Sequence, residues 1–229
     1  MTRLILSGGT GVAAVGLFDA DALPCDGPPS PDGFLEMESR HSVVRFSTGG
    51  DGGYVLHAYV DEAVPSELLK YCSADDKRSS RLKLSSGNLA FGGVESAYAT
   101  FVPNSTVRSD ARVPPATYDV TAYRTEYPSN LREHAIRAQV GPTGLQILNA
   151  PGYIVPAALV LPIVAFYTSG FLAGASLFGA AASSLFLLTR SPAFKRLSAE
   201  KRAIDLQYPS IVVHMKSGSQ QATVKTEVA

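Results

Sequence analysis

The stretch from Tyr153 to Leu188 reads YIVPAALVLPIVAFYTSGFLAGASLFGAAASSLFLL, and it decides how the rest of the chain is organised. No Lys, Arg, Asp or Glu occurs between Arg137 and Arg190, a run of 52 positions. One membrane crossing needs about 20 apolar residues, because an α-helix rises about 1.5 Å per residue and the hydrocarbon core is about 30 Å thick. The run is longer than one crossing requires, and it predicts a transmembrane α-helical hairpin.

The most polar part of this stretch is Tyr-Thr-Ser-Gly at residues 167–170, where we expect a tight turn. Two short helices are predicted beside it, near 152–167 and 170–189. Pro156 and Pro162 lie in the first helix; proline removes a backbone donor, which membrane helices tolerate better than soluble ones. Two alternatives stay open. In one, the first segment is re-entrant or interfacial and only the second segment crosses the membrane. In the other, the helical hairpin is buried in the core of a soluble domain.

Basic residues lie on both flanks of the apolar stretch. Arg132 and Arg137 precede it, and Arg190, Lys195, Arg196, Lys201 and Arg202 follow it. Basic residues beside a membrane segment are retained on the cytoplasmic side. We therefore expect a multi-pass protein of the cytoplasmic (inner) membrane with both termini in the cytoplasm. The five basic residues after the hairpin are expected to anchor the chain at anionic lipid head groups.

Small residues recur at helical spacing in the second predicted helix. Gly170 and Gly174 are four positions apart, and so are Ala175, Gly179 and Ser183. In lipid, helices associate through close packing at such positions. This pattern predicts self-association or packing on a partner's membrane helix. The alternative is that these residues seat the first helix of the same hairpin.

Residues 1–150 are predicted to form a mainly β soluble domain, either a sandwich or a small barrel. Runs of β-forming residues, separated by Gly- or Pro-containing turns, lie at 42–46, 54–60, 96–102 and 116–124. Only residues 63–71 are expected to be helical in this domain, and residues 26–32 are expected to form a loop.

Residues 190–229 form a third predicted region. It begins with a basic juxtamembrane helix within 192–206. A strand near 210–215 is expected to return and pair with the edge of the β domain. The chain from Ser217 onward is expected to be a disordered tail.

The segment Ser-Gly-Gly-Thr-Gly at residues 7–11 follows the apolar residues 4–6. It is similar to the opening of nucleotide-binding α/β folds, where glycines admit a phosphate at a helix N-terminus. The following residues, 12–18, are β-branched and interrupted by glycine, and they favour a turn between two strands. The candidates for binding a cofactor are Gly8, Gly9, Thr10 and Gly11, and no cofactor is otherwise expected.

Charge and side-chain chemistry narrow the classes of function. Residues 1–150 carry 13 basic and 17 acidic residues, and an acidic domain does not suit nucleic acid as a partner. The four histidines, His41, His57, His134 and His214, lack metal-ligand spacing. Cys25 and Cys72 are expected to be unpaired in a reducing compartment. Seven of the ten tyrosines lie between residues 54 and 127. We expect them to form a binding surface or to be ordinary strand residues.

These patterns predict a membrane-tethered binding protein rather than an enzyme. One concrete form is an immunity-type protein that neutralises a toxin, with membrane lipids and a protein partner or a second copy as its contacts. One alternative is a ligand-gated membrane effector whose helices oligomerise and perturb the bilayer. The other is a nucleotide-using enzyme at the Gly-rich turn.

Overall fold

Residues 2–23, 27–104 and 106–218 are described by the computed structural model, in which the chain divides into two units. The β unit comprises Met1–Glu126 and Pro209–Ala229, and the helical unit comprises Tyr127–Tyr208. The helical unit is inserted in sequence between two strands of the β unit. Long helices thus follow a part of the chain that consists mostly of strands in two sheets.

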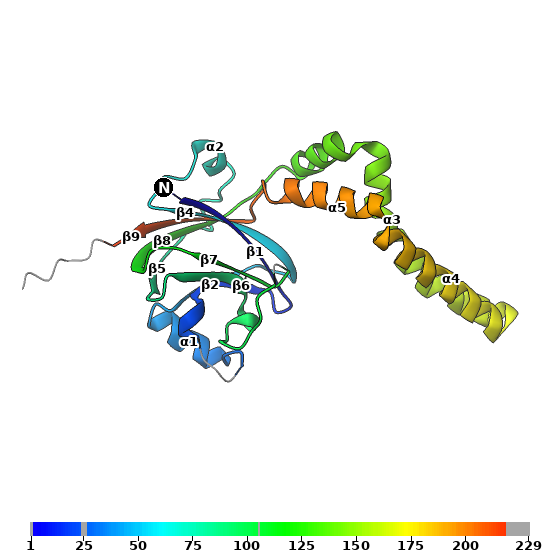
Figure 1. Ribbon diagram of the computed structural model, residues 1–229, viewed down its shortest axis with the longest axis horizontal. Coiled ribbons are helices and arrows are strands. Elements are labelled where there is room, and N and C mark those ends of the chain that lie inside the picture. Colours follow the sequence, from blue (N-terminus) through cyan, green and yellow to red (C-terminus); the bar gives the residue numbers. More distant parts are fainter. Residues whose placement is uncertain (1, 24–26, 105, 219–229) are drawn as a thin grey trace, which may run out of the picture. The chain divides into compact units, whose positions relative to one another are not determined.

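A five-stranded sheet with the order β1-β4-β9-β8-β5 forms one layer of the β unit (Figure 1). Its strands are β1 (Thr2–Thr10), β4 (Gly52–Val60), β9 (Ile211–Ser217), β8 (Ala116–Arg124) and β5 (Arg78–Leu84). β4 and β9 are parallel, and the other neighbours are antiparallel.

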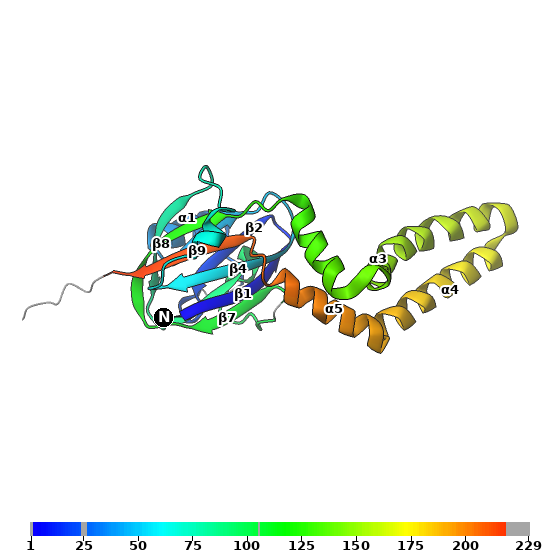
Figure 2. The same cartoon turned by 90° about the horizontal axis from the view of Figure 1, so that it is seen from above.

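The strand predicted near 210–215 exists as β9, but its predicted place in the sheet is wrong. β9 lies between β4 and β8 rather than at the edge (Figure 2). Its residues Ile211, Val212, Val213 and Met215 are all buried, as a continuous apolar run requires when both faces of a strand are covered. The strand also continues through Ser217, where the tail was predicted to begin; residues 219–229 lie outside the described part of the chain.

A four-stranded antiparallel sheet with the order β3-β2-β6-β7 forms the second layer. Its strands are β3 (Val43–Ser47), β2 (Ala14–Asp19), β6 (Asn88–Gly93) and β7 (Arg108–Arg112). Leu17 and Phe91 of this sheet share the main core with Leu56, Tyr118 and Val213 of the other. Phe18 joins a second cluster on the other side, so β2 is buried on both faces and does not alternate.

Helix α1 (Pro31–Ser39) contributes Phe34 to this second cluster. The predicted loop at 26–32 therefore runs into a helix that the sequence analysis missed. Its start signals are present: the Ser30 side chain caps the Gly33 amide at 3.2 Å, and Pro31 lies in the first turn. The surrounding prolines and glycines concealed them. The short helix α2 (Ser66–Leu69) lies inside the predicted 63–71 segment.

The two sheets are also joined at their margins, so the sandwich has barrel-like seams. On one side, the Gly9 amide donates to the Val107 carbonyl at 3.1 Å. On the other, the Lys83 amide donates to the His41 carbonyl at 2.7 Å. The strand predicted at 96–102 is absent: the 3₁₀ turns are η1 (Ala20–Ala22) and η2 (Val94–Ser96), and a loop follows η2.

The helical unit consists of α3 (Ser129–Ser169), α4 (Phe171–Arg190) and α5 (Pro192–Asp205). Gly170, within the residues 167–170 where a turn is expected, separates α3 from α4 with φ +91°. The first helix is longer than predicted: α3 begins at Ser129, inside the region assigned to the β domain by its boundary at residue 150. Residues 129–140 form the first arm of α3, and Ile136 is buried on it.

Candidate functional site: an exposed apolar helical hairpin

Helices α3 and α4 lie side by side as a hairpin (Figure 2). Small residues form much of the seam between them. Gly174 is buried there, and a Cβ on Gly174 would lie 2.8 Å from the Pro162 carbonyl oxygen. In the middle of the hairpin, the other residues that are only partly exposed are Ala158, Pro162 and Ala165 on α3 and Ala173 and Ala181 on α4. Toward its base, Ile154, Leu185 and Leu188 are partly exposed as well. Close approach of the two helices therefore depends on small side chains in the middle of the hairpin.

Most of the large apolar side chains of the hairpin are exposed. Leu159 is 60% exposed, Phe171 71% and Leu172 80%. Val160, Leu161, Ile163, Val164, Phe178 and Leu187 are exposed as well. Both α3 and α4 contain an apolar window of the length that one membrane crossing needs, and 0% and 6% of these windows are buried. A soluble hairpin has the opposite arrangement, with large apolar residues in the seam.

Hydroxyl groups within the hairpin bond to their own helices. The Thr168, Ser184 and Thr189 side chains donate to the carbonyls of residues four positions earlier, at 2.8–2.9 Å. Such back-bonding satisfies the donor without water or a second helix. The tip carries an aromatic group, in which the Phe166 ring meets Tyr167 at 5.5 Å and Phe171 at 6.3 Å between ring centroids.

The predicted stripe of small residues on α4 is divided by the structure. Gly174 seats α3, as the alternative interpretation expected, and Gly170 forms the turn. Ala175, Gly179 and Ser183 are exposed, and a Cβ on Gly179 would meet no atom within 4 Å. Of these five small residues, Gly174 therefore packs against α3, Gly170 forms the turn, and the other three lie on an exposed face of α4.

Helix α5 carries most of the basic residues that were predicted to anchor the chain. Leu197 and Ile204 are buried on its apolar face, and a Cβ on Gly144 of α3 would lie 3.0 Å from Leu197 Cδ2. Lys195 and Arg202 are exposed, Arg196 pairs with Glu200 at 3.3 Å, and Lys201 pairs with Asp205 at 2.8 Å. Arg190, at the end of α4, lies over the Phe186 ring at 4.2 Å.

Two basic side chains, Arg132 of α3 and Lys201 of α5, contact the carboxylate of Asp205. Burial raises the pKa of its carboxyl group, but hydrogen bonds from Arg132 and Lys201, together with their charges, outweigh burial and hold the pKa below its usual value. The carboxylate is therefore the charged form that joins α5 to α3.

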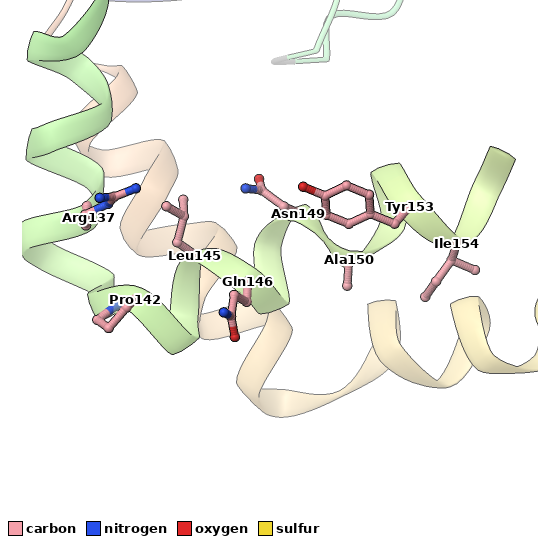
Figure 3. Close-up of a pocket in the computed structure, with 8 residues that line it drawn as sticks. All are labelled: Arg137, Pro142, Leu145, Gln146, Asn149, Ala150, Tyr153 and Ile154. Carbon is pink, nitrogen blue, oxygen red and sulfur yellow. The ribbon is translucent and has the colours of Figure 1, made fainter. Parts of the chain in front are cut away.

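An elbow interrupts α3 before the hairpin begins. Gly141 has φ +71° and ψ 171°, which are not helical, and Pro142 starts the next helical arm. A cavity of about 480 Å³ lies in this region (Figure 3). Its lining includes Arg137, Asn149 and Tyr153. In the sequence Arg137 is only a charge that flanks the apolar run, and this grouping is not visible there because a helix break brings the residues together.

The Gly-rich turn has no helix after it and already holds a carboxylate. Gly8, Gly9 and Thr10 belong to strand β1, and the turn after it leads to β2 in the other sheet. Glu95 accepts hydrogen bonds from the Gly11 amide at 2.7 Å and the Thr10 hydroxyl at 3.1 Å. These are the donors that a phosphate would need.

Close backbone packing explains the two glycines of the strand. A Cβ on Gly8 would lie 2.7 Å from Gly92 Cα, and a Cβ on Gly9 would lie 2.5 Å from the Thr106 carbonyl oxygen. A side chain at Gly8 would collide with backbone of β6, and one at Gly9 would collide with backbone of the segment that leads into β7. The glycines therefore serve the seam between the sheets.

The remaining side chains that the sequence analysis singled out are dispersed. Among the described residues, no three His, Cys, Asp or Glu side chains are grouped as a metal site would require. Tyr59 and Tyr118 are buried, and the other five tyrosines between 54 and 127 are half-buried, which favours a structural role. Cys72 is a free thiol whose pKa is raised by burial, and Cys25 lies outside the described residues.

A second hollow, of about 600 Å³, lies on the β unit beside α1. Pro29 and Met37 supply apolar surface to it, while Arg40, Lys83 and Glu36 supply charge. Mixed apolar and charged surface of this kind is typical of protein-binding sites rather than of enclosed small-molecule pockets.

No family model and no curated protein matches this chain. Among solved structures, the chain is similar to the protein titled "Crocagin biosynthetic gene J", with 18% identity and a TM-score of 0.39 over 54% of this chain and 75% of that one. It is also similar to ComJ from Bacillus subtilis, described as an inhibitor of the DNA-degrading activity of NucA. That match has 11% identity and a TM-score of 0.34 over 55% of this chain and 82% of that one. Both scores lie below 0.5, so neither similarity supports an inference about function.

Proposed function

We propose that this chain is a membrane-tethered binding protein, in which the α3–α4 hairpin lies in the bilayer of the cytoplasmic membrane and the β unit binds a protein partner in the cytoplasm. The observation that carries the proposal is the inverted packing of the hairpin. Small residues such as Gly174 form its seam, and large apolar residues such as Leu172 cover its outside. In lipid this arrangement costs nothing, because hydrocarbon tails solvate the outer face and helices associate through close packing.

The charge distribution supports the proposed orientation. The helical unit has seven basic and three acidic residues, a net charge of +4, and no charged residue lies between Arg137 and Arg190. Its basic residues all flank this uncharged run, where they favour the cytoplasmic side. Because α3 and α4 form a hairpin, both ends of the helical unit emerge on the same side. This topology keeps both parts of the β unit in one compartment, as the pairing of β8 with β9 requires.

The binding role is assigned to the hollow beside α1. Its apolar residues Pro29 and Met37 are bordered by Glu36, Arg40 and Lys83. An apolar centre bordered by charges of both signs suits a protein partner that presents the same mixture of apolar and charged groups. The finer form of the proposal is an immunity-type protein, which neutralises a toxin that acts at the membrane.

The topology is tested by labelling single cysteines in the full-length chain, in a variant without native cysteines. Tyr167→Cys places the thiol at the hairpin tip, where Tyr167 is 81% exposed, and Ser39→Cys places it at the end of α1. A membrane-impermeant maleimide is expected to label Tyr167→Cys in intact cells and Ser39→Cys only after the membrane is opened. Labelling of both positions, or of Ser39→Cys alone, in intact cells would reject the topology, and a protein released by carbonate washing would reject the membrane segment.

The partner surface is tested by placing a photo-crosslinking residue at Met37 and, as a control, at Val12, which is 58% exposed elsewhere on the β unit. A specific crosslinked protein is expected at Met37 only. Equal crosslinking at both positions would contradict a binding site beside α1.

The free face of α4 favours a second candidate, a membrane effector whose helices oligomerise. Ala175, Gly179 and Ser183 are exposed on this face. The two candidates differ in one observable, since an effector permeabilises vesicles when it assembles and a tethered binding protein leaves a trapped dye inside.

A further inference from the structure

Three hydrogen-bond donors converge on the inner side of the elbow in α3. Figure 3 shows the Arg137 guanidinium, the Asn149 amide and the Tyr153 hydroxyl directed toward the same space, between the two arms of the helix. The arm before the break supplies Arg137, and the arm after it supplies Asn149 and Tyr153, four positions apart on one helical face. The break at Gly141 is what turns these two arms toward each other.

The cavity changes from polar to apolar along its length. Arg137 is the last charged residue before the uncharged run, whereas Ala150 and Ile154 belong to the arm that continues into the hairpin. Tyr153 lies at the change from one to the other and is exposed. An amphipathic tyrosine at such a position is typical of the level of the lipid head groups.

We propose that this cavity binds one anionic phospholipid, with its phosphate held by Arg137, Asn149 and Tyr153 and its acyl chain lying along Ile154. This inference rests on the proposed membrane function. Guanidinium, amide and phenol groups are all donors to phosphate oxygens, and a guanidinium matches phosphate by two parallel hydrogen bonds. The cavity, at about 480 Å³, is large enough for a head group while its open side admits the chain.

Glu133 is the group that competes with a phosphate for Arg137. Its carboxylate lies 3.3 Å from the guanidinium, and the two side chains are 59% and 58% exposed. An exposed pair of this kind contributes little to stability, so a phosphate that also bonds to Asn149 and Tyr153 displaces it at small cost.

The site is tested by native mass spectrometry of the full-length protein in a non-ionic detergent. Phosphatidylglycerol and phosphatidylcholine with the same acyl chains are added in turn. The expected result is one retained phosphatidylglycerol, and about tenfold less of it in Arg137→Gln, because a charged hydrogen bond is lost. Asn149→Ala and Tyr153→Phe should weaken retention as well.

Lys77→Gln is the control, because it removes one positive charge at an exposed side chain outside the cavity and outside the basic residues that flank the hairpin. It should keep the retained lipid. An equal loss in Lys77→Gln and Arg137→Gln would show only general charge attraction and would overturn the site. Competition by millimolar inorganic phosphate with no dependence on the lipid would likewise overturn it, by assigning the donors to free phosphate.

The experiments distinguish an error in the lipid site from an error in the proposed membrane function. If Tyr167→Cys is labelled at the far side of the membrane but lipid retention does not depend on Arg137, the hairpin stands and the lipid site is wrong. If the chain is not embedded at all, the proposed function is wrong, and the lipid site falls with it. Unchanged circular dichroism in each variant excludes unfolding as the cause of a loss.

Discussion

The Nε atom of Arg132, near the start of α3, lies 2.8 Å from a carboxylate oxygen of Asp205 at the end of α5. This ion pair joins two segments between which the whole apolar run lies in the sequence. Lys201 donates to the other carboxylate oxygen at 2.8 Å. Nearby in sequence, the Tyr127 and Tyr208 rings meet edge to face at 5.3 Å, at the first and last residues of the helical unit. These contacts close the base of the inserted unit, so that both ends of the hairpin start from a defined position.

Asp205→Asn should weaken the attachment of α5 to α3 by about 1 kcal/mol, since the pair is only partly buried. Because the pKa of Asp205 is lowered in the folded state, its contribution is present above the unfolded pKa of about 3.9 and is lost as the pH falls through the lower folded value. Thermal unfolding of the full-length protein between pH 7 and pH 3 measures this. The variant should lose part of the acid sensitivity of the wild-type protein.

Glu200→Gln is the control for Asp205→Asn. Glu200 pairs with Arg196 within α5, where the Arg196 side chain is 78% exposed, and the pair makes no link to α3. Its unfolding should match the wild-type protein at every pH. An equal effect of the two substitutions would mean that helix charge, rather than the link to Arg132, is responsible.

Gly174→Val should separate α3 from α4, because its Cβ would lie 2.8 Å from the Pro162 carbonyl oxygen. Pulsed electron paramagnetic resonance between spin labels at Leu159 and Leu177 would report a longer and broader distance distribution. Gly179→Val is the matched control, since a Cβ there meets no atom within 4 Å. A change of oligomeric state in Gly179→Val alone would instead support the effector candidate.

Gly9→Val should destabilise the β unit by about 1–3 kcal/mol, because the added side chain meets the Thr106 carbonyl oxygen at 2.5 Å. Hydrogen exchange of β1 and β7 in the full-length protein would measure the loss of protection. Gly50→Ala is the control, since that position is open. Unchanged protection in Gly9→Val would contradict a structural role for the Gly-rich segment.

Arg108→Ala should destabilise the β unit by about 3 kcal/mol, because it leaves Asp110 without its partner in a protein interior. Arg108 is 3% exposed, contacts Asp110 through Nε at 2.8 Å, and donates to the Ser96 carbonyl at 3.0 Å. Denaturant unfolding measures the difference. Arg81→Ala, which breaks an ion pair with Asp119 whose partners are 64% and 61% exposed, should change stability by less than about 1 kcal/mol.

The position of the hairpin and its turn were predictable from sequence because they depend on local composition. An uncharged run with a polar break before Gly170 specifies two helices and a turn without reference to the rest of the chain. Strands such as β4 and β8 were predictable for the same reason. Helix α1 was missed, because prolines and glycines around its cap at Ser30 obscured the signal.

The candidate site itself was only partly predictable. The basic residues around the hairpin were found, but the elbow that groups Arg137 with Asn149 was not. The helix breaks at a single residue, Gly141, and this one break changes the direction of the whole arm that follows it. Likewise, the repeat of small residues on α4 predicted close packing but did not say which of them packs.

By itself, the sequence of this protein determined that an uncharged helical hairpin interrupts a domain made of short strands, because length, charge and turn chemistry act locally. Only the tertiary structure decided that β9 is a central strand, that Gly174 rather than Gly179 lies in the seam, and that Gly8 and Gly9 lie where two sheets meet. These outcomes depend on contacts between residues far apart in the chain. Strand register and close backbone approach arise only when both partners are in place.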